Sequence, residues 1–322
     1  MNLGKGSRDT VLAGLVALPF AATVALADEG GVSFWLPGQY ASFAAIAPDP
    51  GFSLPMQTYY YSGSAGASKA LNRGGQASFG LDSDFAAQFL TPTWTPHSTF
   101  LGARPSFSLT FFPGWSRTSA DVGLGAHAAS RADEASGFGD LYPMAQLFWS
   151  KGVHNWMTYL TGNIPVGAYD PDRLSNLGLG HAAVDAGGSY TYLNTKTGWE
   201  FSATAGLTYN FENPDTDYTS GIDSHLDIGV SRFLNQQLFV GAVGYAYLQL
   251  TPDEGQPEAF GNVESRTFAV GPQVGYNFDA GGTTIYANLR GYYEFGVQNR
   301  TEGGSVFLTV DLPLSALAHR KM

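Results

Sequence analysis

Hydrophobic and polar residues alternate with a period of two close to the C-terminus of the chain. From Ile285 to Val297 the odd positions are mostly apolar, and the even positions include polar side chains such as Arg290 and Glu294. After a turn at 298–304 the same pattern returns over 306–314. Successive side chains of a strand point to opposite faces, so both runs predict strands with one apolar and one polar face. Each run is about ten residues or slightly longer, which is the length that a tilted strand needs to cross a bilayer.

The alternation recurs along the chain and predicts a series of strands. They cover residues 53–62, 77–96, 104–112 continuing through 120–128, 138–150, 153–166, 182–193, 200–212, 222–233, 238–250, 266–278, 284–297 and 306–314. Residues 63–76 and 129–137 are rich in small or polar residues, and we expect them to be loops. If 101–128 is one long, bent pass, the chain has twelve strands. Ten or fourteen strands are the alternatives if the N-terminal strands are miscounted.

The connections from residue 138 onward alternate between short and long. The short ones are 151–152, 194–198, 234–236 and 279–282, and the long ones are 167–180, 213–221, 251–264 and 298–304. Outer-membrane barrels have short periplasmic turns and longer outside loops. The sequence therefore predicts an all-β fold, an antiparallel transmembrane β-barrel over residues 53–314 with both ends on the periplasmic side. A soluble β-sandwich is disfavoured, because the face opposite the apolar one is mostly uncharged.

Composition supports a barrel whose outer surface faces lipid. Charged residues are only 13% of the chain, aromatic residues are 14%, and glycine accounts for 41 of 322 residues. A soluble domain of ordinary composition has about 25% charged residues. The net charge of −11 argues against nucleic acid as a partner, and the chain has no cysteine for disulfide bonds. Outer-membrane lipid is the predicted surrounding, and the sequence assigns no oligomeric state.

The first residues have the pattern of a secretory signal peptide. Lys5 and Arg8 precede an apolar run over 11–26, which ends in the small-residue exit Ala25-Leu26-Ala27. This pattern predicts cleavage after Ala27, Sec-type export and a mature chain that begins at Asp28. A transmembrane anchor is disfavoured, because the run is short and contains a proline.

Residues 28–52 are not strand-like, and proline and glycine bound their apolar, aromatic centre. They form either a plug inside the barrel, with Trp35, Tyr40 and Phe43 as the candidate plug residues, or a periplasmic extension. Residues 315–322 form a tail after the last strand.

Several inward-facing positions carry side chains that suit the lining of a lumen. These candidates are Asp185, Glu200, His225, Asp227, Tyr245, Tyr247, Tyr286, Arg290, Tyr292 and Glu294. The run Asp223-x-His225-x-Asp227 is either a cation site or a hydrogen-bonded lining against Arg290 or Arg232, and we favour the lining, so no metal site is predicted. An internal ion-pair network of Asp185, Glu200, Arg290 and Glu294 is a further expectation.

No motif for catalysis is present. The chain lacks a Gly-x-Ser-x-Gly nucleophile motif and a phosphate-binding loop, and no histidine stands in a pattern typical of a lipid-side hydrolase. We expect neither an enzyme nor a cofactor.

Five stretches go beyond a generic barrel pattern. They are residues 30–40 (GGVSFWLPGQY), 137–143 (GFGDLYP), 152–159 (GVHNWMTY), 165–181 (PVGAYD, then RL, NLG and H) and 208–218 (TYNFENPDTDY). Together they resemble the outer-membrane family known as "meta-pathway of phenol degradation", over most of the mature chain. The resemblance implies passage of small hydrophobic or aromatic compounds across the outer membrane, and it implies no catalytic residues. The alternatives are a structural or adhesive barrel with a filled lumen, and a polar general porin.

Overall fold

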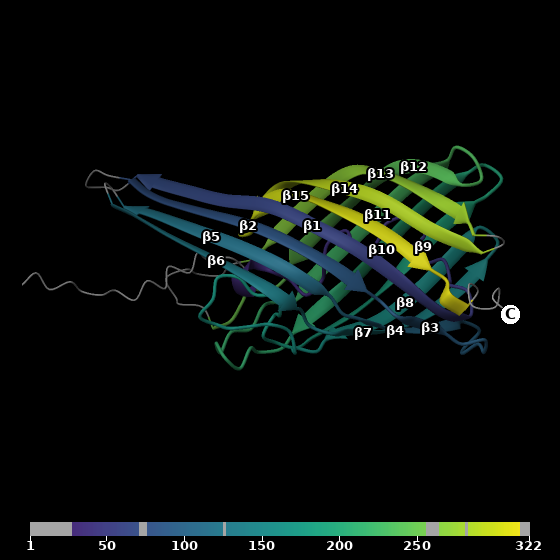
Figure 1. The fold of residues 1–322 in the computed structure, drawn as a ribbon, viewed down its shortest axis with the longest axis horizontal. Coiled ribbons are helices and arrows are strands. Elements are labelled where there is room, and N and C mark those ends of the chain that lie inside the picture. The colour runs from purple at the N-terminus through teal and green to yellow at the C-terminus, as the bar shows by residue number, and fades with distance from the viewer. Residues whose placement is uncertain (1–27, 71–75, 125–126, 256–263, 281–282, 316–322) are drawn as a thin grey trace, which may run out of the picture.

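The computed structural model describes residues 28–70, 76–124, 127–255, 264–280 and 283–315, so the expected signal peptide and residues 316–322 of the expected tail lie outside the described part. The described residues form one antiparallel sheet of fifteen strands, which closes into a barrel where β15 pairs with β1 (Figure 1). The strands are β1 (Gly51–Ala70), β2 (Gln76–Leu90), β3 (Thr93–Thr95), β4 (Arg104–Thr110), β5 (Pro113–Leu124), β6 (His127–Phe138), β7 (Tyr142–Lys151), β8 (His154–Asn163), β9 (Ala183–Asn194), β10 (Trp199–Asn210), β11 (Asp223–Phe233), β12 (Leu238–Gln249), β13 (Arg266–Asp279), β14 (Thr284–Gln298) and β15 (Glu302–Leu312). No helix among these residues is long and apolar enough to cross a membrane.

Three pairs of consecutive strands are single passes with a short interruption. β2 continues into β3, β4 into β5, and β6 into β7, and the members of one pass pair with the members of the next. The barrel therefore has twelve passes, which confirms the predicted number. The interruptions fall at Pro92, which has no backbone N–H for a ladder, and at residues 111–112 and 139–141.

In two segments that the sequence indicated as loops, residues 63–70 with 76 and residues 129–137 are strand. β1 and β2 pair in regular register from Met56↔Leu90 to Ala70↔Gln76, and β6 pairs with β5 along its whole length. These hairpins extend beyond the rest of the barrel at the end where the long loops lie (Figure 1). The prediction failed because backbone pairing defines these strands, and their small and polar side chains give no apolar alternation to detect.

On most strands the apolar face is the outer face of the barrel, and β14 shows this arrangement clearly. On β14, Leu289 and Tyr293 are 47% and 69% exposed, whereas Asn288 and Arg290 are 1% and 3% exposed. The inward face of β14 is thus the polar one, the reverse of a soluble sheet and the arrangement of a barrel in lipid.

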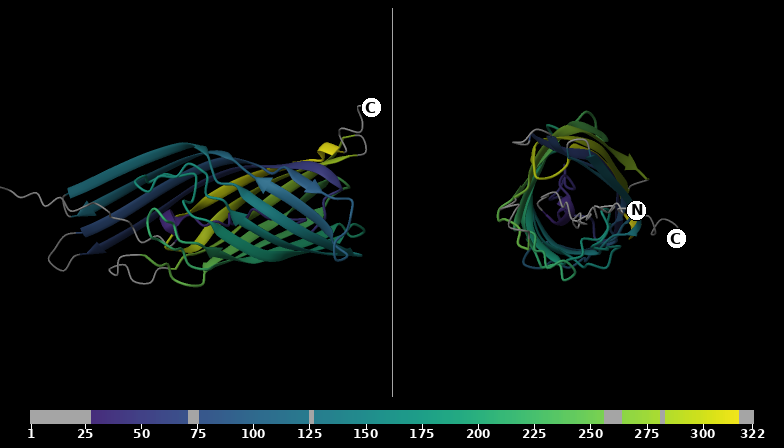
Figure 2. Two further views of the ribbon diagram at one scale, coloured as in Figure 1. Left: turned by 90° about the horizontal axis from the view of Figure 1, so that it is seen from below. Right: turned by 90° about the vertical axis from the view of Figure 1, so that its left-hand side faces the viewer.

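Residues 28–50 lie inside the barrel, and we call them the lumenal segment. They run from the long-loop end, where Asp28 contacts the loops, to the opposite end, where Gly51 begins β1 by pairing with Thr95. The view along the barrel shows this N-terminal part within the ring of strands (Figure 2). Apart from the short 3-10 helix η1 (Glu29–Gly31), the segment has no regular secondary structure.

Candidate functional site

A turn in the middle of the lumenal segment is held between two opposite charges. Gln39 donates its backbone N–H to the carbonyl of Leu36 (3.1 Å), which closes a turn over Pro37 and Gly38. The two carboxylate oxygens of Asp227 accept the N–H groups of Gly38 (2.8 Å) and Tyr40 (3.2 Å). The buried guanidinium of Arg290 donates to the carbonyls of Gly38 (3.1 Å) and Gln39 (2.8 Å). Charge-assisted hydrogen bonds of this kind are the strong ones, so we call Asp227 and Arg290 the clamp.

Gly38 is required by the geometry of the clamp. Its φ is +81°, which suits the third position of a type II turn after a proline. A Cβ atom at this position would lie 2.8 Å from Cζ of Tyr292 and 3.0 Å from Cδ1 of Tyr245. The Tyr292 hydroxyl also donates to the Gly38 carbonyl (3.1 Å), so the tyrosine ring lies directly against the turn.

The next part of the segment has no strand to pair with, and side chains of the barrel satisfy its backbone instead. The N–H groups of residues 43, 44 and 45 donate to Glu200 Oε1 (3.0 Å), Ser202 Oγ (3.3 Å) and Thr191 Oγ1 (3.0 Å). These acceptors come from β9 and β10 and are buried. Buried backbone donors must find partners, so this wall of the barrel fits this segment.

Trp35 packs on the predicted Asp-x-His-x-Asp run. Its ring stacks on the His225 imidazole with centroids 3.5 Å apart and planes 12° apart. Nε2 of His225 lies 3.0 Å from Asp185 Oδ2 and 3.2 Å from the Tyr159 hydroxyl. Asp227 points to the clamp instead, and the described residues contain no group of three or more ligands that could hold a metal. The hydrogen bonds of His225 are of the kind that the favoured interpretation expected. Its partners are Asp185 and Tyr159, whereas the sequence suggested Arg290 or Arg232.

The expected ion-pair network is wrong. Glu200 accepts from Ser231 (2.8 Å) and from the segment, and Glu294 accepts from Tyr245 (2.7 Å) and Tyr61 (3.1 Å). Arg290 donates to carbonyl, amide and hydroxyl oxygens, and its guanidinium lies 4.4 Å from the ring centroid of Phe307. Hydroxyl, amide and aromatic partners thus replace the salt bridges.

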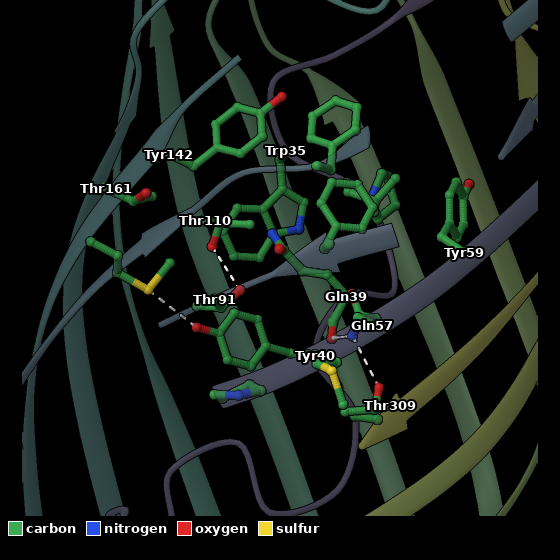
Figure 3. A pocket seen from close by; sticks show the side chains of 18 of the residues that line it. Trp35, Gln39, Tyr40, Gln57, Tyr59, Thr91, Thr110, Tyr142, Thr161 and Thr309 are labelled. Carbon is green, nitrogen blue, oxygen red and sulfur yellow. Dashed lines mark hydrogen bonds between the residues drawn. The ribbon is translucent and has the colours of Figure 1, made fainter. Parts of the chain in front are cut away.

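A cavity of about 2020 Å³ lies between the lumenal segment and the wall formed by β1–β7. Its lining runs from Arg173, in the long loop between β8 and β9, to Lys196 and Gln236 in the short turns, so it extends along the barrel. Apolar and aromatic side chains of β1, β2 and β7 and of the β4–β5 interruption form much of its wall, and Trp35 and Tyr40 line it from the segment (Figure 3). The wall residues are Tyr59, Phe85, Phe89, Phe112, Tyr142 and Met144.

The predicted lumen residues divide into two groups. Tyr245, Tyr286, Arg290 and Glu294 line the cavity, as do the candidate plug residues Trp35, Tyr40 and Phe43. Asp185, Glu200, His225, Asp227, Tyr247 and Tyr292 are buried behind or against the segment and do not line it. A role of any of them in solute passage stays a prediction, as does closure of the barrel by the segment.

Sequence reasoning missed the aromatic residues of the cavity wall. Phe85 and Phe89 share the inward face of β2 with Leu81, and Phe112 continues the inward face of Ser108 and Thr110. The period-two pattern places them correctly once each pass is followed through its interruption.

Polar groups from four loops meet the start of the lumenal segment. Asp28 Oδ2 accepts from Tyr247 (2.9 Å) and Ser265 (3.1 Å) and lies 3.5 Å from Arg300 Nη1. Burial raises the pKa of the Asp28 carboxyl, Arg300 opposes this rise, and the Asp253 carboxylate adds to it. Burial, together with the nearby carboxylate of residue 29, raises the pKa of Tyr169 to about 12.

Comparisons with known proteins agree with this fold. Residues 67–310 match the model of a family described as "Putative MetA-pathway of phenol degradation", which confirms the resemblance seen in the sequence. The crystal structure of an outer membrane channel from Pseudomonas putida F1 superposes with a TM-score of 0.61 at 16% identity, covering 85% of this chain and 99% of that one. A Pseudomonas aeruginosa FadL homologue gives a TM-score of 0.46 at 9% identity, covering 90% of this chain and 98% of that one. No curated protein sequence matches the chain.

Proposed function

Because this chain belongs to that phenol-degradation family, we propose that it is an outer-membrane channel for small hydrophobic or aromatic compounds. In this proposal the chain is exported, loses residues 1–27 and folds into the outer membrane. It works as a passive route and carries neither a cofactor nor a catalytic group.

The cavity beside the lumenal segment is the observation that carries the proposal. It is lined from the long loops to the short turns, so a solute has continuous space along the barrel. Its volume of about 2020 Å³ exceeds the roughly 300–1,000 Å³ of a ligand pocket that encloses one drug-sized molecule. A small aromatic solute would therefore move within it and would not be enclosed.

The chemistry of the lining indicates the class of solute. Rings such as Phe85, Phe89 and Phe112 offer stacked and edge-to-face contacts to another ring. Among them, hydroxyls of Thr91, Thr110 and others supply hydrogen bonds for a polar substituent (Figure 3). A general porin has a polar, water-filled lumen, so the aromatic wall favours an apolar solute over the porin alternative. A structural barrel with a filled lumen would have no cavity of this size.

The test is transport by the purified mature chain, residues 28–322, in proteoliposomes and planar bilayers. We expect faster entry of phenol or toluene than of glucose, relative to vesicles without protein, together with a small ion conductance. A large, steady conductance with equal entry of glucose would favour the porin. Absence of both conductance and solute entry would favour the structural barrel.

A further inference from the structure

The first residue of the expected mature chain lies against a carboxylate. The backbone nitrogen of Asp28 is 3.1 Å from Oδ2 of Asp253, in the loop between β12 and β13. Hydrolysis of the Ala27–Asp28 bond would leave a carboxylate on Ala27 and an α-ammonium group on Asp28. The atom next to Asp253 would then carry a positive charge and three N–H donors in place of one neutral donor.

The Asp253 carboxylate is fixed in place by neighbouring donors. Its Oδ2 accepts the Tyr218 hydroxyl (2.5 Å), and its Oδ1 accepts the backbone N–H of Gly221 (2.8 Å) and the side-chain amide of Gln249. These donors come from the preceding loop and from the end of β12, so the carboxylate is oriented before any ammonium group arrives. A pre-oriented anion loses little conformational entropy on pairing with a cation.

The residue that follows also joins the loops. Glu29 accepts hydrogen bonds from Tyr169 (3.1 Å), Asn213 (2.6 Å) and Thr216 (2.7 Å), and its own N–H donates to Ser220 (3.3 Å). The expected long loop 298–304 is only the turn 299–301 between β14 and β15, so together with Arg300 beside Asp28 the contacts reach three long loops and this turn. The start of the mature chain is therefore the point where these loops meet.

The local charge balance favours a cation at this point. Asp28, Glu29 and Asp253 bring three carboxylates together, and Arg300 contributes the nearby permanent positive charge. An α-ammonium group adds a second positive charge and makes the contact to Asp253 charge-assisted, which about doubles the strength of a hydrogen bond.

We propose that Asp253 is a binding site for the α-ammonium group of Asp28, and that this ion pair fastens the processed chain to the long loops. A chain with residues before Asp28 holds its lumenal segment more weakly. The inference rests on the proposed processing and on the position of the segment in the lumen, and it does not depend on the solute.

The test is a double-mutant cycle at pH 7 with four refolded chains. One pair begins at Asp28, released from a fusion whose protease leaves this residue first, and the other pair carries Gly-Ser before it. Each pair exists with Asp253 and with Asp253→Asn. The readouts are the rate of chymotrypsin cleavage after Trp35 and the reactivity of the α-amine toward an amine-selective ester.

We expect the Gly-Ser extension to speed cleavage about tenfold in the chain with Asp253 and less than about twofold with Asp253→Asn, because the charge-assisted contact is already lost there. In the chain that begins at Asp28, Asp253→Asn should raise α-amine reactivity about tenfold. Equal effects of the extension in both backgrounds, or an α-amine that reacts fast in the unaltered chain, would overturn the proposal. Solute entry is measured separately, so a chain that shows the coupling but transports nothing would reject only the proposed function.

Discussion

The two walls of the lumen are built on the same fold and treat the lumenal segment differently. The wall of β9–β14 presents buried carboxylates, hydroxyls and amides, and these bind the backbone of the segment at the clamp and at residues 43–45. The wall of β1–β7 presents rings such as Phe85 and Phe112, and between it and the segment lies the cavity. Among the described residues, few hydrogen bonds join the segment to this wall, one of them from Gln57 Nε2 to the carbonyl of Gln39 (3.3 Å).

This difference suggests that one wall holds the lumenal segment and that the other wall faces the solute. Hydrogen bonds to a polar wall fix the segment because every buried donor must keep its partner. The aromatic wall offers few such bonds and leaves space, so a solute would pass along it without displacing the segment. Changes to one wall should therefore release the segment, and changes to the other should alter which solutes pass.

Asp227→Ala should have the largest effect on the polar wall. It removes the acceptor of two N–H groups and leaves the Arg290 charge without its opposite across the turn. Hydrogen bonds to a charged group contribute about 1.5–3 kcal/mol each, so the equilibrium for docking should weaken about 100-fold or more. The measurement is the rate of chymotrypsin cleavage after Trp35, with single-channel conductance as a second readout.

Asp84→Ala is the matched control, because Asp84 is a carboxylate on the outward face of β2, where it accepts from Tyr60 (3.3 Å). It should leave cleavage unchanged. If both variants, or neither, expose Trp35, the polar wall does not hold the segment through Asp227.

Gly38→Ala should have the next largest effect. A side chain at φ +81° costs about 1–2 kcal/mol, and the Cβ would also press on the Tyr292 ring, so cleavage after Trp35 should accelerate about thirtyfold. Gly66→Ala is the control, since its Cβ would meet only the carbonyl oxygen of Phe79 at 3.5 Å. An unchanged rate of cleavage after Trp35 in the Gly38→Ala chain would mean that the clamp also holds a turn of another type.

The sequence predicted most of the barrel for a simple reason. Alternation reports burial directly, so the period of two is enough to assign Leu289 and Arg290 to opposite faces of one strand. The pattern failed in the hairpin extensions, where backbone pairing defines the strands and the small, polar side chains show no apolar alternation.

The site was less predictable, because a period of two gives the face of a residue and not its partner. Asp227 and Arg290 were recognised as inward residues, but their shared contact is a turn about 190 and 250 residues earlier in the chain. The lumenal segment has no periodic pattern, so only the three-dimensional structure shows which wall it follows.

The aromatic wall is tested by Phe85→Ala combined with Phe89→Ala. Each ring contact contributes about 0.5–1.5 kcal/mol, so entry of toluene into proteoliposomes should slow about tenfold. Ion conductance and cleavage after Trp35 should not fall, because neither ring holds the segment through a hydrogen bond. Phe295→Ala, on the outward face of β14, should leave toluene entry unchanged. Unaltered entry in the double variant would mean that solutes take another path.

Tyr169→Phe should have the smallest effect, and its sign should depend on pH. The Tyr169 hydroxyl donates to Glu29 Oε1 (3.1 Å), and its pKa is raised to about 12. A raised pKa means that the folded state favours the protonated phenol, so its stabilising contribution is complete below about pH 10 and is lost as the pH rises through 12.

At pH 8 the phenylalanine variant should therefore show an open-state fraction about fivefold that of the unaltered chain, since the hydrogen bonds of the hydroxyl to Glu29 and from Asn213 are both missing and each contributes about 0.5 kcal/mol. As the pH rises from 10 to 12 the two fractions should converge and then cross. The phenolate would repel the Glu29 carboxylate in the unaltered chain, whereas phenylalanine carries no charge. Planar bilayers give both fractions over this range. Parallel curves that never converge would show that Tyr169 acts on the segment through packing alone and not through its proton.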